Sequence, residues 1–239
     1  MGRTILITND DGIYKDGLMR LARACVRFGD VWLIAPRHQR SACSHSITLD
    51  VPIDITPVPY AVEGVRAYSC SGMPGDCVRI GTKAVMDREP DVVMAGINYG
   101  YNAATDIQYS ATVGAVLEAS FLGYRGIALS ENDGLCHEVT DRYLEEVLEE
   151  LIDRDPGPDQ VWNVNFPGCP LAACSGILRD RTMSQAIVYE DWYQPARQLP
   201  GGGIRYVVSG EMQCRAEAGS DFDAILRGAV SIGRVRNLC

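Results

Sequence analysis

The N-terminal part of the chain, up to about Leu151, alternates short apolar runs with stretches of helical periodicity. The run Thr4–Thr8 has the length and composition of a buried strand, and apolar residues then recur at helical spacing from Leu18 to Phe28 before a second apolar run at Val31–Ala35. Repeated strand–helix–strand units form a parallel sheet with helices on its faces, joined by right-handed connections. We therefore expect an α/β fold with a doubly wound, mostly parallel sheet.

Further elements follow from the same patterns. The segment 36–70 is rich in Pro, Ser and Thr and predicts a hairpin that leaves the core, with strands at Val51–Ile55 and Val65–Ser69. Pro74 suits the first turn of a helix, and Ser110 suits a helix N-cap. The remaining expected elements are helices at 74–86, 110–123 and 143–151 and strands at 91–95, 126–130 and 161–166.

The pattern changes after Phe166, where the helical period disappears. Short segments at 176–181, 186–189 and 204–209 look like strands joined by turns that contain Gly and Pro. We expect one domain over residues 1–239, in which residues 1–165 form the α/β core and residues 166–239 form a β-rich arm used in oligomerisation.

Composition excludes several classes of function. The formal net charge of -9 opposes non-specific binding to DNA or to anionic membranes. No apolar run approaches the roughly 20 residues of a membrane span, and the chain starts with a strand-like run where a signal peptide would have a basic and then apolar leader. The nine cysteines include no Cys-x-x-Cys pair and are expected to be reduced thiols. We expect a cytoplasmic protein without DNA or membrane partners.

Polar loops follow the expected strands that end at Thr8, Ala35 and Ala95, and ligands of doubly wound sheets bind at this edge. The first loop reads Asn9-Asp10-Asp11-Gly12 and offers two carboxylates, which suit Mg²⁺ or Mn²⁺. Alternatively, one Asp caps the next helix and the other is a solvated turn residue.

The second loop, from Pro36 to Ser46, concentrates hydroxyls, imidazoles and guanidiniums. Arg37 and Arg40 could bind phosphate oxygens. A histidine on each side of Ser41 also fits a Ser-His hydrolase, but Gly-x-Ser-x-Gly is absent. His38 and His45 could instead only satisfy hydrogen bonds within the loop.

The third loop starts at Gly96 and offers the side-chain carbonyl of Asn98, and the amides of Ser110 to Val113 at a helix N-terminus form an anion site. An ordinary glycine-containing loop followed by a capped helix is the alternative here. Neither a Gly-x-x-x-x-Gly-Lys-Ser/Thr loop nor a Gly-x-Gly-x-x-Gly motif after the first strand occurs, so the three loops together predict a metal-centred phosphate site.

The sequence resembles the SurE family of survival-protein nucleotidases. The resemblance extends from the first strand to about Ser130 and continues more weakly to the C-terminus. It is carried by Ile7-Thr8-Asn9-Asp10-Asp11-Gly12, Ala35-Pro36 through Ser46-Ile47-Thr48-Leu49, Gly75-Asp76-Cys77-Val78, Pro90-Asp91 through Gly96-Ile97-Asn98, Tyr109-Ser110-Ala111-Thr112-Val113 and Gly219-Ser220-Asp221.

The resemblance implies a Rossmann-like core, a homodimer or homotetramer, and a phosphomonoesterase that uses one divalent metal ion, Mg²⁺ or Mn²⁺, to release phosphate from nucleoside 5′- or 3′-monophosphates. The chain departs from the family pattern at Gln39, where Asn is common, and at Ala42 and Ala111, where Gly is common. The implied metal ligands are Asp10, Asp11, Ser41 and Asn98, the catalytic residues are Asp10, Asp11, Asn98 and Ser110, and the substrate-binding residues are Asn9, Ser41, Ser110, Ala111 and Thr112.

We hypothesise that a metal-activated water attacks phosphorus in line, with Asp11 as the candidate for orienting or deprotonating it. Two other functions stay open at this point. The same metal site could serve a non-nucleotide substrate of a biosynthetic pathway, or the chain could bind nucleotides without catalysis.

Overall fold

The structure of the protein is a computed structural model, which describes residues 2–134 and 136–237. Its strands are β1 (Arg3–Thr8), β2 (Gly29–Pro36), β3 (Ile55–Pro57), β4 (Val65–Cys70), β5 (Val92–Tyr99), β6 (Arg125–Glu131), β7 (Gln160–Phe166), β8 (Ile177–Arg181), β9 (Tyr189–Gln198), β10 (Ile204–Met212) and β11 (Val230–Arg236). Its helices are α1 (Asp16–Cys25), α2 (Pro74–Ile80), α3 (Ala111–Phe121), α4 (Glu138–Leu151) and α5 (Asp221–Leu226), with a π-helical turn η1 (Gly81–Val85) and 3₁₀ turns η2 (Ala104–Tyr109), η3 (Leu171–Ala173) and η4 (Pro200–Gly202).

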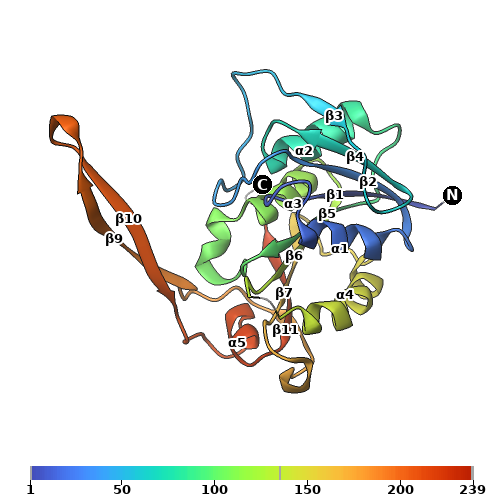
Figure 1. The fold of residues 1–239 in the computed structure, drawn as a ribbon. Helices are drawn as coiled ribbons and strands as arrows, with labels where there is room; N and C mark the ends of the chain where they lie inside the picture. The colour runs from blue at the N-terminus through green and yellow to red at the C-terminus, as the bar shows by residue number, and fades with distance from the viewer. Residues whose placement is uncertain (1, 135, 238–239) are drawn as a thin grey trace.

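The main sheet has nine strands in the order β3-β4-β2-β1-β5-β6-β7-β11-β8 (Figure 1). The strands from β4 to β7 are parallel, whereas β3 and β11 are antiparallel to β4 and β7. The chain winds from β1 toward β4 on one side and from β5 toward β7 on the other, so its direction reverses between β1 and β5. This order confirms the expected doubly wound, Rossmann-like α/β fold.

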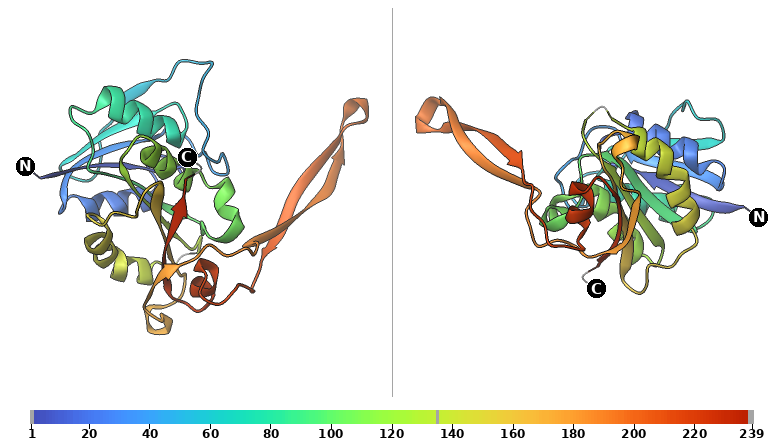
Figure 2. Two further views of the ribbon diagram at one scale, coloured as in Figure 1. Left: turned by 180° about the vertical axis from the view of Figure 1, so that it is seen from behind. Right: turned by 90° about the horizontal axis from the view of Figure 1, so that it is seen from below.

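Side-chain alternation along the strands builds two core layers. In β1, Ile5 and Ile7 pack into the layer with α1 and α4, and Leu6 packs into the layer with α2 and α3. The two helix pairs accordingly cover opposite faces of the sheet (Figure 2). The sheet is buried on both faces, which explains the nearly continuous apolar runs of its strands.

The segment between β2 and α2 differs from the expectation. No strand forms at 51–54, where Pro52 lacks the N–H that a ladder needs, and the strand β3 begins only at Ile55. The strand β4 does not leave the core, because it pairs in parallel with β2 and thereby extends the main sheet. The expected excursion is therefore wrong.

The residues after Phe166 serve two purposes. The strands β8 and β11 extend the main sheet, with β11 lying between β7 and β8. The strands β9 and β10 form a separate antiparallel hairpin, here called the arm (residues 189–212), which projects away from the body (Figures 1 and 2). Large apolar side chains are exposed along the arm: Tyr189, Trp192, Tyr193, Ile204, Tyr206, Val207, Val208 and Met212.

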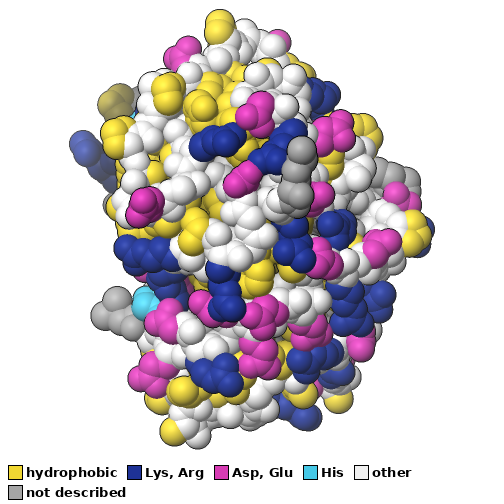
Figure 3. Space-filling view, turned by 90° about the vertical axis from the view of Figure 1, so that its right-hand side faces the viewer, with side chains coloured by type: hydrophobic (Ala, Val, Ile, Leu, Met, Phe, Trp, Pro, Cys, Tyr) yellow, Lys and Arg dark blue, Asp and Glu magenta, His cyan; other side chains and the backbone are white. Residues whose placement is uncertain are grey.

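The face of the molecule on the far side from the arm carries interleaved basic and acidic side chains (Figure 3). Ion pairs at the amino ends of the strands include Arg3 with Asp153 and Arg88 with Asp30. Mutually neutralised charges of this kind do not make a phosphate site. Within the described residues, no helix has the length and apolar character required to cross a bilayer.

Candidate active site

The turn after β1 places two buried carboxylates at the point where the sheet reverses its winding. Asp10 is 3% exposed and Asp11 is 7% exposed. The buried amide of Asn9 shapes this turn, because it accepts the N–H of Gly12 at 3.2 Å and donates to the Gly12 carbonyl at 3.0 Å. Asn9 thus fixes the backbone that presents both aspartates.

Asn98 lies on the neighbouring strand β5. The expected strand 91–95 continues through Tyr99, with an irregularity after Ala95, so Asn98 belongs to the strand end and not to a loop. The backbone N–H of Tyr99 donates to Asp11 Oδ2 at 3.3 Å, which joins the two strand ends. The side-chain nitrogen of Asn98 donates to Gly100 O at 2.8 Å, so its carbonyl oxygen is the atom suited to a cation.

Close packing of α1 against β5 holds this arrangement. A Cβ added to Gly17 would lie 2.1 Å from the backbone oxygen of Ile97, next to Asn98. Because of this short distance, any side chain at position 17 would displace the strand end that carries Asn98. The peptide between Gly96 and Ile97 in the same strand is cis.

The segment 37–48, here called the Ser41 loop, approaches the aspartates through its backbone. The N–H of Arg40 donates to the carbonyl of Asp10 at 2.6 Å. Ser41 is exposed, and its hydroxyl accepts a hydrogen bond from Gln39 Nε2 at 3.0 Å. Ser41 thus follows a residue that is bonded to the carboxylate turn, and Gln39 sets the position of its hydroxyl.

The start of α3 supplies the remaining residues of the candidate site. Thr112 is fully buried, and its hydroxyl donates to Asp10 Oδ1 at 2.6 Å. Ser110 is the N-cap, as expected, because its hydroxyl accepts the N–H of Val113 at 3.0 Å. Ala111 is the first residue of the helix and is buried. The positive end of α3 therefore faces the carboxylate turn.

Burial dominates the electrostatics of the two carboxylates. It raises the pKa of Asp10 to about 6; the charge of Asp11 acts in the same direction, whereas the hydrogen bond from Thr112 lowers the pKa. Burial also raises the pKa of Asp11, opposed by the Tyr99 N–H and by the charge of Lys15. Two adjacent buried carboxylates of this kind are stabilised by a cation.

The donor set fits a hard cation. Asp10 and Asp11 supply charged oxygens, and Asn98 and Ser41 supply neutral ones, which is the ligand chemistry of Mg²⁺ and Mn²⁺. Nowhere in residues 2–134 and 136–237 do three or more His, Cys, Asp or Glu side chains gather as a metal site. The neutral ligands must therefore complete the coordination of any cation held here.

Sequence reasoning missed a buried residue that supports the site. Glu118 on α3 is 4% exposed, and its carboxylate binds His45 at 2.7 Å and Arg79 at 2.8 Å. Since His45 belongs to the Ser41 loop, this contact fastens the loop to α3. A Cβ on Gly114 would lie 2.8 Å from Ser44 O and His45 Cα, so the loop and helix pack closely. A lone acidic residue within the apolar helix Ala111–Phe121 was the available signal.

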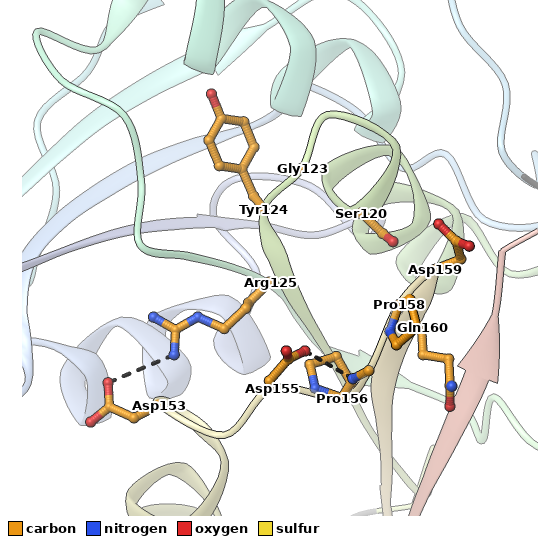
Figure 4. Close-up of a pocket in the computed structure, with 11 residues that line it drawn as sticks. Ser120, Gly123, Tyr124, Arg125, Asp153, Asp155, Pro156, Pro158, Asp159 and Gln160 are labelled. Atoms are coloured by element: carbon orange, nitrogen blue, oxygen red, sulfur yellow. Dashed lines mark hydrogen bonds and ion pairs between the residues drawn. The ribbon is translucent and has the colours of Figure 1, made fainter.

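Cavities lie at both edges of the sheet, and one of them is beside the aspartates. A cavity of about 470 Å³ lies at the amino ends of β6 and β7, where Arg125 and Asp153 face each other across its rim (Figure 4). It is at the opposite edge from the aspartates. A cavity of about 300 Å³ lies beside Asp11, between Lys15 and the Arg37–Gln39 segment.

Comparisons with known proteins indicate the same family for most of the chain. A family model described as Survival protein SurE matches residues 5–188. The 5′-nucleotidase SurE of Aeromonas hydrophila is 34% identical over 233 residues, which cover 95% of this chain and 90% of that protein. The 5′-nucleotidase SurE of Rhodospirillum rubrum is 33% identical over 236 residues, which cover 95% and 88%.

Structural comparison agrees. The crystal structure of the SurE protein from Aquifex aeolicus is similar with a TM-score of 0.81 at 28% identity, and the match covers 99% of this chain and 94% of that one. The similarity thus includes the sheet, both helix layers and the C-terminal strands. The chain belongs to the SurE family.

Proposed function

We propose that this protein is a metal-dependent 5′-nucleotidase, a hydrolase that releases phosphate from nucleoside 5′-monophosphates. The observation that carries the proposal is the pair of buried carboxylates, Asp10 and Asp11, between the end of β5 and the start of α3. The relatives named 5′-nucleotidase SurE support the same activity. A redirected substrate or a non-catalytic role is not favoured.

We assign the proposed roles to individual residues as follows. Asp10, Asp11, Ser41 and Asn98 would hold the metal, and Asn9 keeps their turn in place. The start of α3, with Ser110, Ala111 and Thr112, would bind the phosphate through its N–H groups and its dipole. When bound by these residues, a divalent cation would neutralise phosphate charge and lower the pKa of water.

In the reaction, water attacks phosphorus and the bond from phosphorus to the nucleoside oxygen breaks. In this proposal Asp11 would orient the water or accept its proton, and Ser110 and Asn98 would contact the transferring group. The products are a nucleoside and inorganic phosphate. A 3′-monophosphate offers the same phosphate chemistry and is a second expected substrate.

Several finer points belong to the proposal. One Mg²⁺ or Mn²⁺ ion fits the oxygen ligands. The exposed apolar side chains of the arm support a homodimer or homotetramer assembled through the arm, whereas β8 and β11 belong to the α/β core together with residues 1–165. The described cysteines carry free thiols, which supports a cytoplasmic location.

Metal removal tests the proposal. Phosphate release from nucleoside monophosphates should vanish after chelation and return with Mg²⁺ or Mn²⁺. The variants Asp10→Asn and Asp11→Asn should each lose at least about 100-fold in kcat/KM, because each removes a charged ligand. The surface variant Asp30→Asn is the control, and full activity in Asp10→Asn would refute the metal role.

A further inference from the structure

A third cavity, of about 650 Å³, lies where the arm meets the body. We call it the arm cavity. The body contributes Ala42, Gln108 and Tyr109 to its lining, and the arm contributes Tyr189, Tyr193 and Val208. Its volume falls within the range of about 300–1,000 Å³ that is usual for small-molecule sites.

Hydrogen bonds hold the walls of the arm cavity together. The Ser44 N–H donates to Tyr109 O at 3.1 Å and its hydroxyl donates to Gln108 O at 2.9 Å, which joins the Ser41 loop to η2. The Tyr189 N–H donates to Asp106 Oδ2 at 3.0 Å, which joins η2 to the root of the arm. The cavity is therefore built by three segments that are bonded to one another.

The arm cavity continues from the candidate phosphate site along the chain. Ala42 directly follows Ser41, and Tyr109 directly precedes Ser110. One wall of the cavity is thus made by the residues next to the proposed metal ligand and the α3 N-cap. Through Tyr109, the arm cavity therefore adjoins the N-terminus of α3, at which the phosphate is proposed to bind.

The chemistry of the lining suits an uncharged aromatic ring. Tyr189 and Tyr193 lie on the same face of β9, because they are four residues apart, and Val208 is paired with Tyr193 across the hairpin. The carboxylates of Asp106 and Asp191 also line the cavity and would repel a phosphate. Stacking on tyrosine accepts any base, since every base presents a π-face.

We infer that the arm cavity is the nucleoside subsite, in which Tyr109, Tyr189 and Tyr193 bind the base of the substrate while its phosphate lies at α3. This inference rests on the proposed function. It assigns the arm a direct part in substrate selection, in addition to assembly.

Steady-state kinetics with two substrates test the inference. Adenosine 5′-monophosphate carries a base, and glycerol 3-phosphate does not. In Tyr189→Ala and Tyr193→Ala, the KM for adenosine 5′-monophosphate should rise at least about fivefold, as expected for a lost base–aromatic stack, with the KM for glycerol 3-phosphate unchanged. Tyr193→Phe should restore the nucleotide KM. Tyr206→Ala, an exposed arm tyrosine outside the cavity lining, is the matched control.

The ratio of kcat/KM for the two substrates within one variant separates the outcomes. Misfolding or loss of assembly would lower the activity on both substrates equally. An equal loss of this kind would overturn the proposed subsite, and so would an unchanged KM for both substrates. If the unsubstituted protein released phosphate from neither substrate with any divalent metal, the proposed function itself would fail.

Discussion

Asp10 connects the two parts of the candidate site at the scale of single residues. Its side chain accepts the Thr112 hydroxyl of α3, and its backbone carbonyl accepts the Arg40 N–H of the Ser41 loop. A carboxylate that is 3% exposed has few routes to stabilisation other than such donors and a cation. Each donor to Asp10 is therefore expected to affect metal binding.

Thr112→Val removes one such donor with little change of shape. A hydrogen bond to a charged group contributes about 1.5–3 kcal/mol, so cation binding should weaken by roughly tenfold or more. Calorimetric titration with Mn²⁺ measures this. Thr82→Val is the control, because the Thr82 hydroxyl donates only to nearby helical carbonyls, Val78 O at 2.9 Å and Arg79 O at 3.2 Å. Equal affinities in Thr112→Val and the unsubstituted protein would contradict the role of Thr112.

The raised pKa of Asp10 gives a pH dependence. Its value of about 6 in the metal-free fold lies above the value of about 4 in an unfolded chain. Protonation of Asp10 therefore stabilises the metal-free folded state. This contribution is complete below about pH 4 and is lost as the pH rises through about 6.

Cation binding needs the deprotonated carboxylate, so Mg²⁺ affinity should fall as the pH falls below about 6, with protons released on binding. Calorimetry in buffers of different ionisation enthalpy measures both effects. A pH-independent affinity across this range would show that Asp10 does not ligate the cation.

At the scale of elements, the helix α3 organises the site. Its N-terminus faces the carboxylate turn, and Glu118 in its last part binds His45 and Arg79. The strand tips were predictable, because apolar runs followed by polar loops mark the carboxyl ends of parallel strands. The extension of β5 to Tyr99 was not, since the irregularity after Ala95 depends on pairing with β6 and has no local signal.

Glu118→Ala should loosen the Ser41 loop, because it removes the shared partner of His45 and Arg79. Both partners are about a third exposed, so the loss of stability should be modest, about 1–2 kcal/mol. The larger effect should be a several-fold rise in the metal concentration for half-maximal rate, with partial recovery in Glu118→Gln. Glu146→Ala on the exposed side of α4 is the control. An unchanged metal requirement in Glu118→Ala would exclude this positioning role.

At the scale of the whole molecule, the arm is the feature that sequence patterns described least well. The strand β9 is exposed along its entire length, so no alternation of apolar and polar residues marked it, and the strand expected at 186–189 overlaps it only at Tyr189. Within β10, the segment Ile204–Ser209 was expected. The closing strand β11 was also missed as an element of the sheet. Its residues 231–236 pair with β7, far away in the chain, and no local signal marks this pairing.

Replacing residues 190–211 with a short Gly-Ser turn should leave the body folded, because the arm pairs only with itself among the described strands. The number of subunits in the assembly should decrease, since the exposed apolar side chains of the arm are the expected subunit contacts. Light scattering measures the mass, and circular dichroism checks the fold. An unchanged oligomer would place the subunit interface elsewhere on the protein.

The position of β11 has a consequence for how the chain is made. The strand β8 bonds to the sheet through β11, and β11 also covers the edge of β7. On the ribosome, residues 230–236 emerge after the other described strands, so a nascent chain carries the bare edge of β7 until these residues have been made. Such an edge can pair with other chains. Correct assembly of this protein therefore depends on how quickly β11 reaches the sheet.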